Sequence, residues 1–283
     1  MSIKKNGRII HSIEEWRKYA GPKRPDQWKD GRSAKEVARA WLGDGTNALP
    51  KEVEAILSGH QAFGPVLAWD AEPEVKLRFD KFPGESRNSD IVVQACDNSG
   101  WYLLAVEAKA DEPYADTVVQ TLLDALERRQ DNPRSNGIAR VEQLTEALFG
   151  TKKKNSVRIG DLRYQLLTAC AGALCEAELK KYSRSIMLVH EFVTSATADE
   201  KHIRNEADLE NFVNRLSAGV VTNVPPGQLC GPFFVPGEPL LRSKVALYVG
   251  KVTRNLRTND ANHFKKELSP LKNGGVSQTT LSK

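Results

Sequence analysis

The spacing of apolar residues along the chain predicts helices first and strands later. Over roughly the first sixty residues, apolar positions recur every three or four places, as in amphipathic helices. The segments expected to be helical there are 13–20, 33–42 and 50–59. Ser33, with Glu36 three residues later, predicts a capping box at the start of the second helix.

The pattern then changes to the alternation of polar and apolar residues that half-buried strands show. Three strands are expected, over residues 74–82, 90–97 and 101–109, separated by the polar segments 83–89 and 98–100. The short connections predict an antiparallel meander. Its third strand is the most apolar, so we expect it at the centre of the sheet.

Helical and extended segments alternate in the rest of the chain. Helices are expected at 115–130, 137–149, 161–181 and 206–217, and strands at 183–194, 231–235 and 244–252. The long helix followed by a buried strand indicates a crossover back into the sheet. The predicted fold is α/β, with helices flanking a central mixed sheet that contains the antiparallel three-strand meander.

This order divides the chain into three expected parts. Residues 1–49 form an N-terminal helical segment that packs on the core, residues 50–269 form the α/β core, and residues 270–283 form a polar tail that we expect to be frayed.

The formal net charge of +5 is unevenly distributed. Residues 1–35 hold 10 lysines and arginines against 4 acidic residues, and residues 242–283 hold 9 against 2, which leaves the middle of the chain acidic. Basic ends suit a protein that meets a polyanion such as nucleic acid at its edges. Solvated terminal segments are the alternative interpretation.

The sequence lacks the patterns of several protein classes. No apolar run approaches the ~18 residues that span a bilayer, and no apolar segment follows the basic N-terminus as in a secretory signal. The four cysteines lack zinc-ligand spacing and are expected to be reduced, buried thiols. No phosphate-binding loop, dinucleotide fingerprint or nucleophile elbow is present. We therefore expect a cytoplasmic protein with no membrane partner.

A charged group ends the most apolar predicted strand. Glu107 and Lys109 are two residues apart and so point to one face. The turn near 98–99 places Asp90 opposite residue 107. Two carboxylates, the backbone carbonyl of Ala108 and waters are the hard oxygen ligands that Mg²⁺ prefers, and Lys109 would orient or deprotonate an attacking water. The alternative is a solvated ion pair where the strand leaves the sheet.

This pattern, Asp90 followed after 16 residues by Glu107-Ala108-Lys109, resembles the bipartite motif of the PD-(D/E)XK nuclease superfamily, which has the restriction-endonuclease-like fold. The order of helix, meander, helix and strand over 50–195 is similar to the core of that superfamily, although Ser89 replaces the proline of the motif. The resemblance implies a nuclease that hydrolyses nucleic acid, with DNA as the expected substrate and Mg²⁺ or Mn²⁺ as cofactor. Asp90 and Glu107 would bind the metal, and Lys109 would be the catalytic lysine.

The resemblance also implies two further site residues. Many members add an acidic residue from the preceding helix or first strand, for which Glu52, Glu54 and Glu74 are candidates and Glu54 is preferred. The helix after the third strand often supplies a polar residue, and Gln165 lies on an otherwise small-residue face of the helix 161–181. A glutamine bonded to the sheet backbone is the alternative.

Basic residues near aromatic ones are candidates for phosphate contacts. Arg32, Arg87 and Arg163 are expected to contact nucleic acid. The loop 151–158 is expected to be solvated, with contact to the DNA backbone as the alternative, and His190 is expected to be a core histidine.

Two classes of function remain open from the sequence. One is a metal-dependent nuclease, which would call for a homodimer if it cuts duplexes symmetrically. The other is a non-catalytic protein that retains the nuclease fold and binds nucleic acid or a partner.

Overall fold

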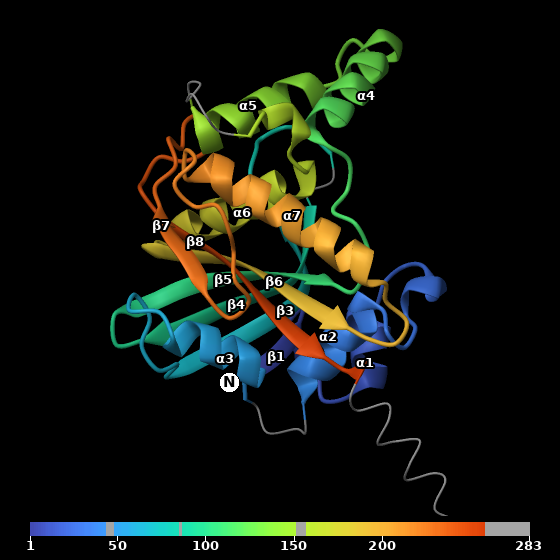
Figure 1. The fold of residues 1–283 in the computed structure, drawn as a ribbon, viewed down its shortest axis with the longest axis vertical. Helices are drawn as coiled ribbons and strands as arrows, with labels where there is room; N and C mark the ends of the chain where they lie inside the picture. The colour runs from blue at the N-terminus through green and yellow to red at the C-terminus, as the bar shows by residue number, and fades with distance from the viewer. Residues whose placement is uncertain (44–47, 85–86, 151–156, 258–283) are drawn as a thin grey trace, which may run out of the picture.

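A mixed sheet of eight strands runs through the computed structural model, which describes residues 1–43, 48–84, 87–150 and 157–257 (Figure 1). The strand order across the described sheet is β2-β1-β3-β4-β5-β6-β8-β7. In chain order the strands are β1 (Ser2–Lys5), β2 (Arg8–Ile9), β3 (Ala68–Leu77), β4 (Arg87–Asp97), β5 (Gly100–Lys109), β6 (Arg184–Val193), β7 (Leu229–Phe233) and β8 (Ala246–Asn255).

The predicted meander is confirmed. Strands β3, β4 and β5 pair antiparallel, and β5 lies near the middle of the sheet. Beyond it, β6 pairs parallel to β5 and β8 pairs parallel to β6, so the sheet is mixed. Ile91 pairs with Val106, and continuing that register places Asp90 opposite Glu107, as the turn position predicts.

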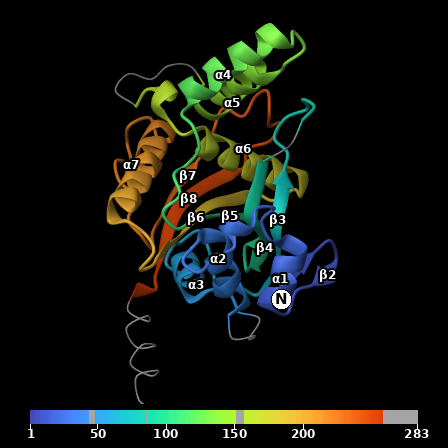
Figure 2. The ribbon, with the colours of Figure 1, turned by 90° about the vertical axis from the view of Figure 1, so that its right-hand side faces the viewer.

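Helices cover both faces of the sheet and create two apolar cores. Under one face lie α1 (Ile13–Ala20), α2 (Ser33–Leu42) and α3 (Lys51–Ser58), with a 3-10 turn at Pro25–Gln27. Over the other face lie α4 (Val118–Asp131), α5 (Gly137–Phe149), α6 (Tyr164–Leu179) and α7 (Asp199–Leu216), with a second 3-10 turn at Ile159–Asp161. Figure 2 shows these layers edge-on, with α4 and α5 stacked beyond α6.

Helix α6 approaches the sheet closely because its middle is built from small residues. A methyl group added at Gly172 would lie 2.9 Å from Leu77 Cβ on β3, which is closer than side chains tolerate. The small-residue face of this helix is therefore the face that packs closely against the sheet. It brings the first turn of α6 directly over the end of β5.

Several details of the prediction were wrong. Strand β3 spans Ala68–Leu77, so it begins six residues and ends five residues earlier than the predicted strand over 74–82. The capping box is absent, because Ser33 Oγ donates to Glu112 (3.1 Å) while Glu36 accepts from the backbone of Gly31 (2.8 Å). Residues 1–49 also add β1 and β2 to the sheet, which the sequence pattern did not predict.

Two predicted segments lie wholly or mostly outside the residues that the structure describes. The polar tail 270–283 and most of the basic loop, residues 151–156, lie outside the described residues. No helix in the described part of the chain combines the length and apolar character needed to cross a membrane.

Candidate functional site

Asp90 and Glu107 lie together at adjoining ends of β4 and β5. Asp90 Oδ2 accepts a hydrogen bond from the amide of Ala108 (2.7 Å), and Glu107 is buried. Burial raises the pKa of Asp90 well above its usual value, and the nearby carboxylates of Glu107 and Glu74 raise it further. The structure therefore gathers three carboxylates: Asp90, Glu107 and Glu74, the last of which was one of three candidates for the third acid.

Lys109 and Gln165 complete a network around Glu107. Lys109 Nζ lies 3.3 Å from Glu107 Oε1 and donates to Gln165 Oε1 at 3.2 Å. Gln165 Nε2 donates to Glu107 Oε1, and Gln165 Oε1 also accepts from the amide of Ala115 (3.1 Å). The Lys109 ammonium also lies 5.0 Å from the centre of the buried Tyr114 ring. The structure therefore brings Gln165, a candidate site residue from the sequence, into contact with Glu107 and Lys109.

Arg87 pairs with Glu107 and was not expected there. Its guanidinium donates to Glu107 Oε2, and its Nε is buried without a hydrogen-bond partner among the described residues. Burial would raise the pKa of Glu107, but Arg87 and Lys109 outweigh that effect and lower it. Glu107 is therefore charged, with both oxygens engaged by groups of the chain itself.

The third carboxylate comes from Glu74, which corrects the preference for Glu54. Glu74 accepts from Asn88 Nδ2 (3.0 Å), and burial followed by the charge of Glu107 raises its pKa, although Asn88 and nearby cations oppose the rise. Its φ of 52° is left-handed, a conformation that costs a non-glycine residue ~1 kcal/mol or more and that often marks functional sites.

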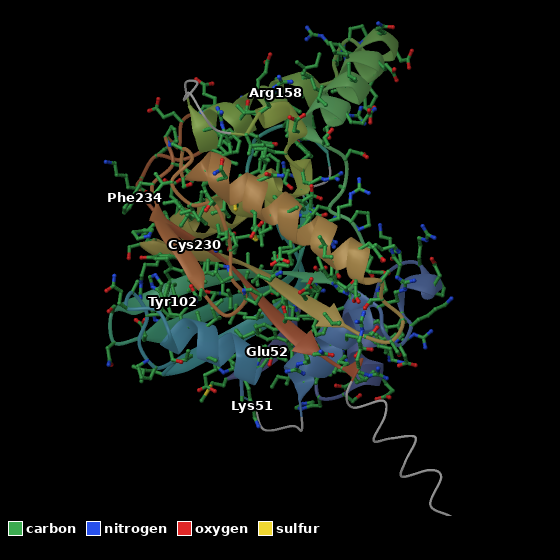
Figure 3. The ribbon with its side chains drawn as sticks, in the orientation of Figure 1. Lys51, Glu52, Tyr102, Arg158, Cys230 and Phe234 are labelled. Carbon is green, nitrogen blue, oxygen red and sulfur yellow. The ribbon has the colours of Figure 1, made fainter. Side chains whose placement is uncertain are left out.

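Glu54 and Glu52 are not brought to this cluster. Glu54 is exposed on α3 and lines a hollow with Gly64, whose amide binds Asp97 at the opposite end of β4. Glu52, labelled in Figure 3 in the layer of α1–α3, pairs instead with His190 Nε2 (2.8 Å) and Arg254 Nε (2.6 Å). His190 is fully buried, as expected of a core histidine.

A local break in strand alternation lets Arg87 and Asp90 reach the same side. On β3, Trp69 and Ala71 belong to the core under α1–α3, whereas Leu77 belongs to the core under α6. These residues are separated by even numbers, so a regular strand would keep them on one face. The reversal occurs near the left-handed Glu74, opposite the segment of β4 that joins Arg87 to Asp90.

Further charged residues extend the site along the same face of the sheet. Glu191 on β6 is in register with Lys109 and bonds His202 Nδ1 (2.9 Å) and Thr253 Oγ1 (2.9 Å). Lys251 Nζ on β8 lies 3.8 Å from Glu191 Oε2. This group was not predicted from the sequence, where its signal was a glutamate in an otherwise apolar strand.

The other two predicted phosphate-binding arginines are already engaged in ion pairs. Arg32 bonds the buried Asp111 at 2.6 Å, and Arg163 bonds Asp208 at 2.9 Å. The structure does not bring either of them to Glu107, whereas it brings Arg87 there directly.

The donor set was also tested for a metal ion. Within the described ranges, no three or more histidines, cysteines, aspartates or glutamates form a ready-made metal cage. Carboxylates from neighbouring strands are nevertheless hard oxygen donors of the kind that Mg²⁺ takes together with several waters. Burial, followed by the charges of Glu107 and Glu74, raises the pKa of Asp90, and a bound divalent cation would favour its charged form. The donor chemistry at Asp90, Glu107 and Glu74 therefore fits Mg²⁺ or Mn²⁺.

Comparison with known proteins gives one match. A family model described as a domain of unknown function matches residues 9–256. Neither the curated proteins nor the solved structures contain a match to the chain.

Proposed function

The chain belongs to the DUF6946 family, which is described as a domain of unknown function. We propose that it is a metal-dependent nuclease that hydrolyses phosphodiester bonds in DNA. The observation that carries the proposal is the convergence of Asp90, Glu107 and Lys109 on one face at adjoining strand ends, with Gln165 over them. Burial of several charged groups together costs free energy of folding. Joint participation in one reaction would explain why the chain keeps them together.

The arrangement of β3 to β6 supports the same proposal. An antiparallel meander, helices that include α6, and then β6 parallel to β5 are what the resemblance to the restriction-endonuclease-like core leads us to expect. The proposed site lies in that core, where the second and third meander strands meet.

Each side chain has a proposed role. Asp90 and Glu107 would hold the metal, with Glu74 as the third acid and the backbone of Ala108 beside them. A bound Mg²⁺ would supply Lewis-acid stabilisation of the phosphoryl oxygens and a more acidic water. Lys109 orients the attacking water and balances charge as it develops on the phosphate. Gln165 holds the Lys109 ammonium and the Glu107 carboxylate in fixed positions.

One observation favours a second candidate function, binding of nucleic acid without cleavage. Arg87, Gln165 and Lys109 already engage both oxygens of Glu107, so a metal ion has to displace at least one of these bonds. If Arg87 never leaves Glu107, the site is a neutralised ion-pair cluster and the protein is a binder.

The test is cleavage of supercoiled and linear DNA in Mg²⁺ or Mn²⁺, with metal binding followed by calorimetry. We expect wild type to cut, Asp90→Asn and Glu107→Gln to lose both metal binding and cutting, and Lys109→Ala to bind metal but cut about 10²–10⁴-fold more slowly. Glu54→Gln, which changes an exposed acid away from the cluster, is the matched control and should behave as wild type.

The result that overturns the proposal is wild-type protein that neither binds metal nor cuts DNA of either form. DNA binding by that same protein would support the second candidate function.

A further inference from the structure

A cavity of about 220 Å³ opens beside the proposed site and shares two residues with it. Arg87 and Gln165, which contact Glu107, form one side. The remaining wall is built by side chains from three separate parts of the chain, chiefly Arg78, Asp80, Arg140 and Tyr164. A ligand in this cavity would therefore touch the residues that hold Glu107.

The cavity carries positive charge. Three guanidinium groups line it: Arg87 pairs with Glu107 and Arg140 with Asp80, so Arg78 supplies the excess positive charge. Arg140 is held rigidly, because its Nε donates to Asp80 Oδ2 (2.6 Å), and Arg78 is held by the carbonyl of Phe82 (3.0 Å). Positioned guanidiniums of this kind suit a phosphate group.

The first turn of α6 adds to the positive electrostatic potential in the cavity. Tyr164 and Gln165 begin this helix of 16 residues and also line the cavity. The helix dipole places partial positive charge at that end, which favours an anion there. The arginines and the helix end therefore act on the same space.

An aromatic wall lies within the same cavity. Tyr164 is half-buried, and burial raises the pKa of its hydroxyl to about 12, so the ring is neutral at physiological pH. A nucleobase stacks on such a ring with little dependence on its identity. The volume of about 220 Å³ is below the ~300–1,000 Å³ of pockets for drug-sized ligands, so the cavity would take the phosphate and one face of the base of a single nucleotide and would exclude a base pair.

We propose that this cavity binds one nucleotide of the substrate strand, with its phosphate at Arg78 and Arg140 and its base against Tyr164. The inference rests on the proposed nuclease function and narrows it. A nucleotide enters such a cavity only when unstacked and unpaired, which costs least in single strands and frayed ends. The expected substrate is therefore single-stranded DNA or a strand end, in preference to an intact duplex.

The test measures binding of 5′-deoxyadenosine monophosphate, inorganic phosphate and deoxyadenosine by calorimetry in EDTA. We expect the nucleotide to bind about tenfold more tightly than either phosphate or deoxyadenosine, because only the nucleotide contacts both the arginines and the Tyr164 ring. Arg78→Ala should weaken the nucleotide and phosphate alike by about tenfold. Tyr164→Leu should weaken the nucleotide and leave phosphate unchanged.

Arg17→Ala is the matched control, because Arg17 is exposed on α1, across the sheet from the cavity, and it should bind as wild type does. Circular dichroism establishes that each variant is folded. Nucleotide binding that is no tighter than phosphate binding, or that survives both cavity substitutions, overturns the inference.

Because these measurements need neither metal nor cleavage, they separate the two proposals. Cleavage of DNA without nucleotide binding would support the nuclease proposal and contradict nucleotide binding in the cavity. Nucleotide binding without any cleavage would support binding in the cavity and contradict the nuclease proposal. Cleavage assays on single-stranded and duplex DNA of one sequence then test the substrate preference directly.

Discussion

At the scale of single residues, Asp90 is the clearest case of a side chain whose position in the fold costs stability. It is half-buried beside Glu107 and Glu74, and desolvation and these charges together raise its pKa. An acid whose pKa is raised on folding weakens the folded state above that pKa, because the unfolded chain releases the proton more readily. Natural proteins keep such groups chiefly where function needs them.

We therefore expect Asp90→Asn to raise the melting temperature by about 2–4 °C at neutral pH in EDTA, the shift that ~1 kcal/mol produces in a chain of this size. The amide still accepts from Ala108 but carries no charge. The gain should shrink as pH falls, because protonated Asp90 is also neutral. Scanning calorimetry measures it, Glu54→Gln is the control, and a lower melting temperature for Asp90→Asn would contradict the expectation.

At the scale of elements, the close approach of α6 to β3 positions Gln165 over β5. The contact depends on Gly172, where an added methyl group would lie 2.9 Å from Leu77 Cβ. Overpacking of this kind typically lowers stability by about 1–3 kcal/mol. The higher helix propensity of alanine over glycine offsets only part of that loss.

Gly172→Ala should therefore destabilise the protein by about 1–2 kcal/mol in urea unfolding and shift α6. Gly64→Ala is the control, since a methyl group there meets only an ordinary contact at 3.7 Å. Equal stability of Gly172→Ala and wild type would show that α6 adjusts without cost.

The elements also show where reasoning from sequence succeeds and where it stops. Periodicity located the meander, and turn length put Asp90 opposite Glu107, because both follow from local rules. The choice among Glu52, Glu54 and Glu74 failed, because it depends on a left-handed residue that reverses the facing of β3, and no local pattern announces it. The pairing of Arg87 with Glu107 depends on the same reversal.

At the scale of the whole molecule, two ion-pair clusters tie distant segments together. Asp97 at the end of β4 binds Arg184 on β6 (2.7 Å), and Glu52 on α3 binds Arg254 on β8 (2.6 Å). The Arg184 bond lowers the pKa of Asp97 to about 2. Burial would raise the pKa of Glu52, but bonds from His190 and Arg254 outweigh it and lower the pKa to about 2.

These two acids predict how stability depends on pH. An acid whose pKa is lowered on folding stabilises the protein above its unfolded value, and the contribution disappears as pH falls through the folded value. We expect the unfolding free energy to drop between about pH 4 and pH 2, with roughly 2–3 kcal/mol from Asp97 alone. Urea titrations across this range check it, and Asp97→Asn should show a shallower decline. An identical decline in both proteins would contradict the assignment.

Arg87 and Lys109 neutralise Glu107 from within the chain, so folding does not wait for a cation. Structural zinc domains behave in the opposite way and unfold when a chelator removes their ion. EDTA should therefore change the melting temperature of this protein by less than about 1 °C in calorimetry, and a larger fall would reveal a structural metal. If the proposed metal-dependent activity holds, the protein would stay folded but inactive when metal is scarce, and it would regain activity without refolding once metal returns.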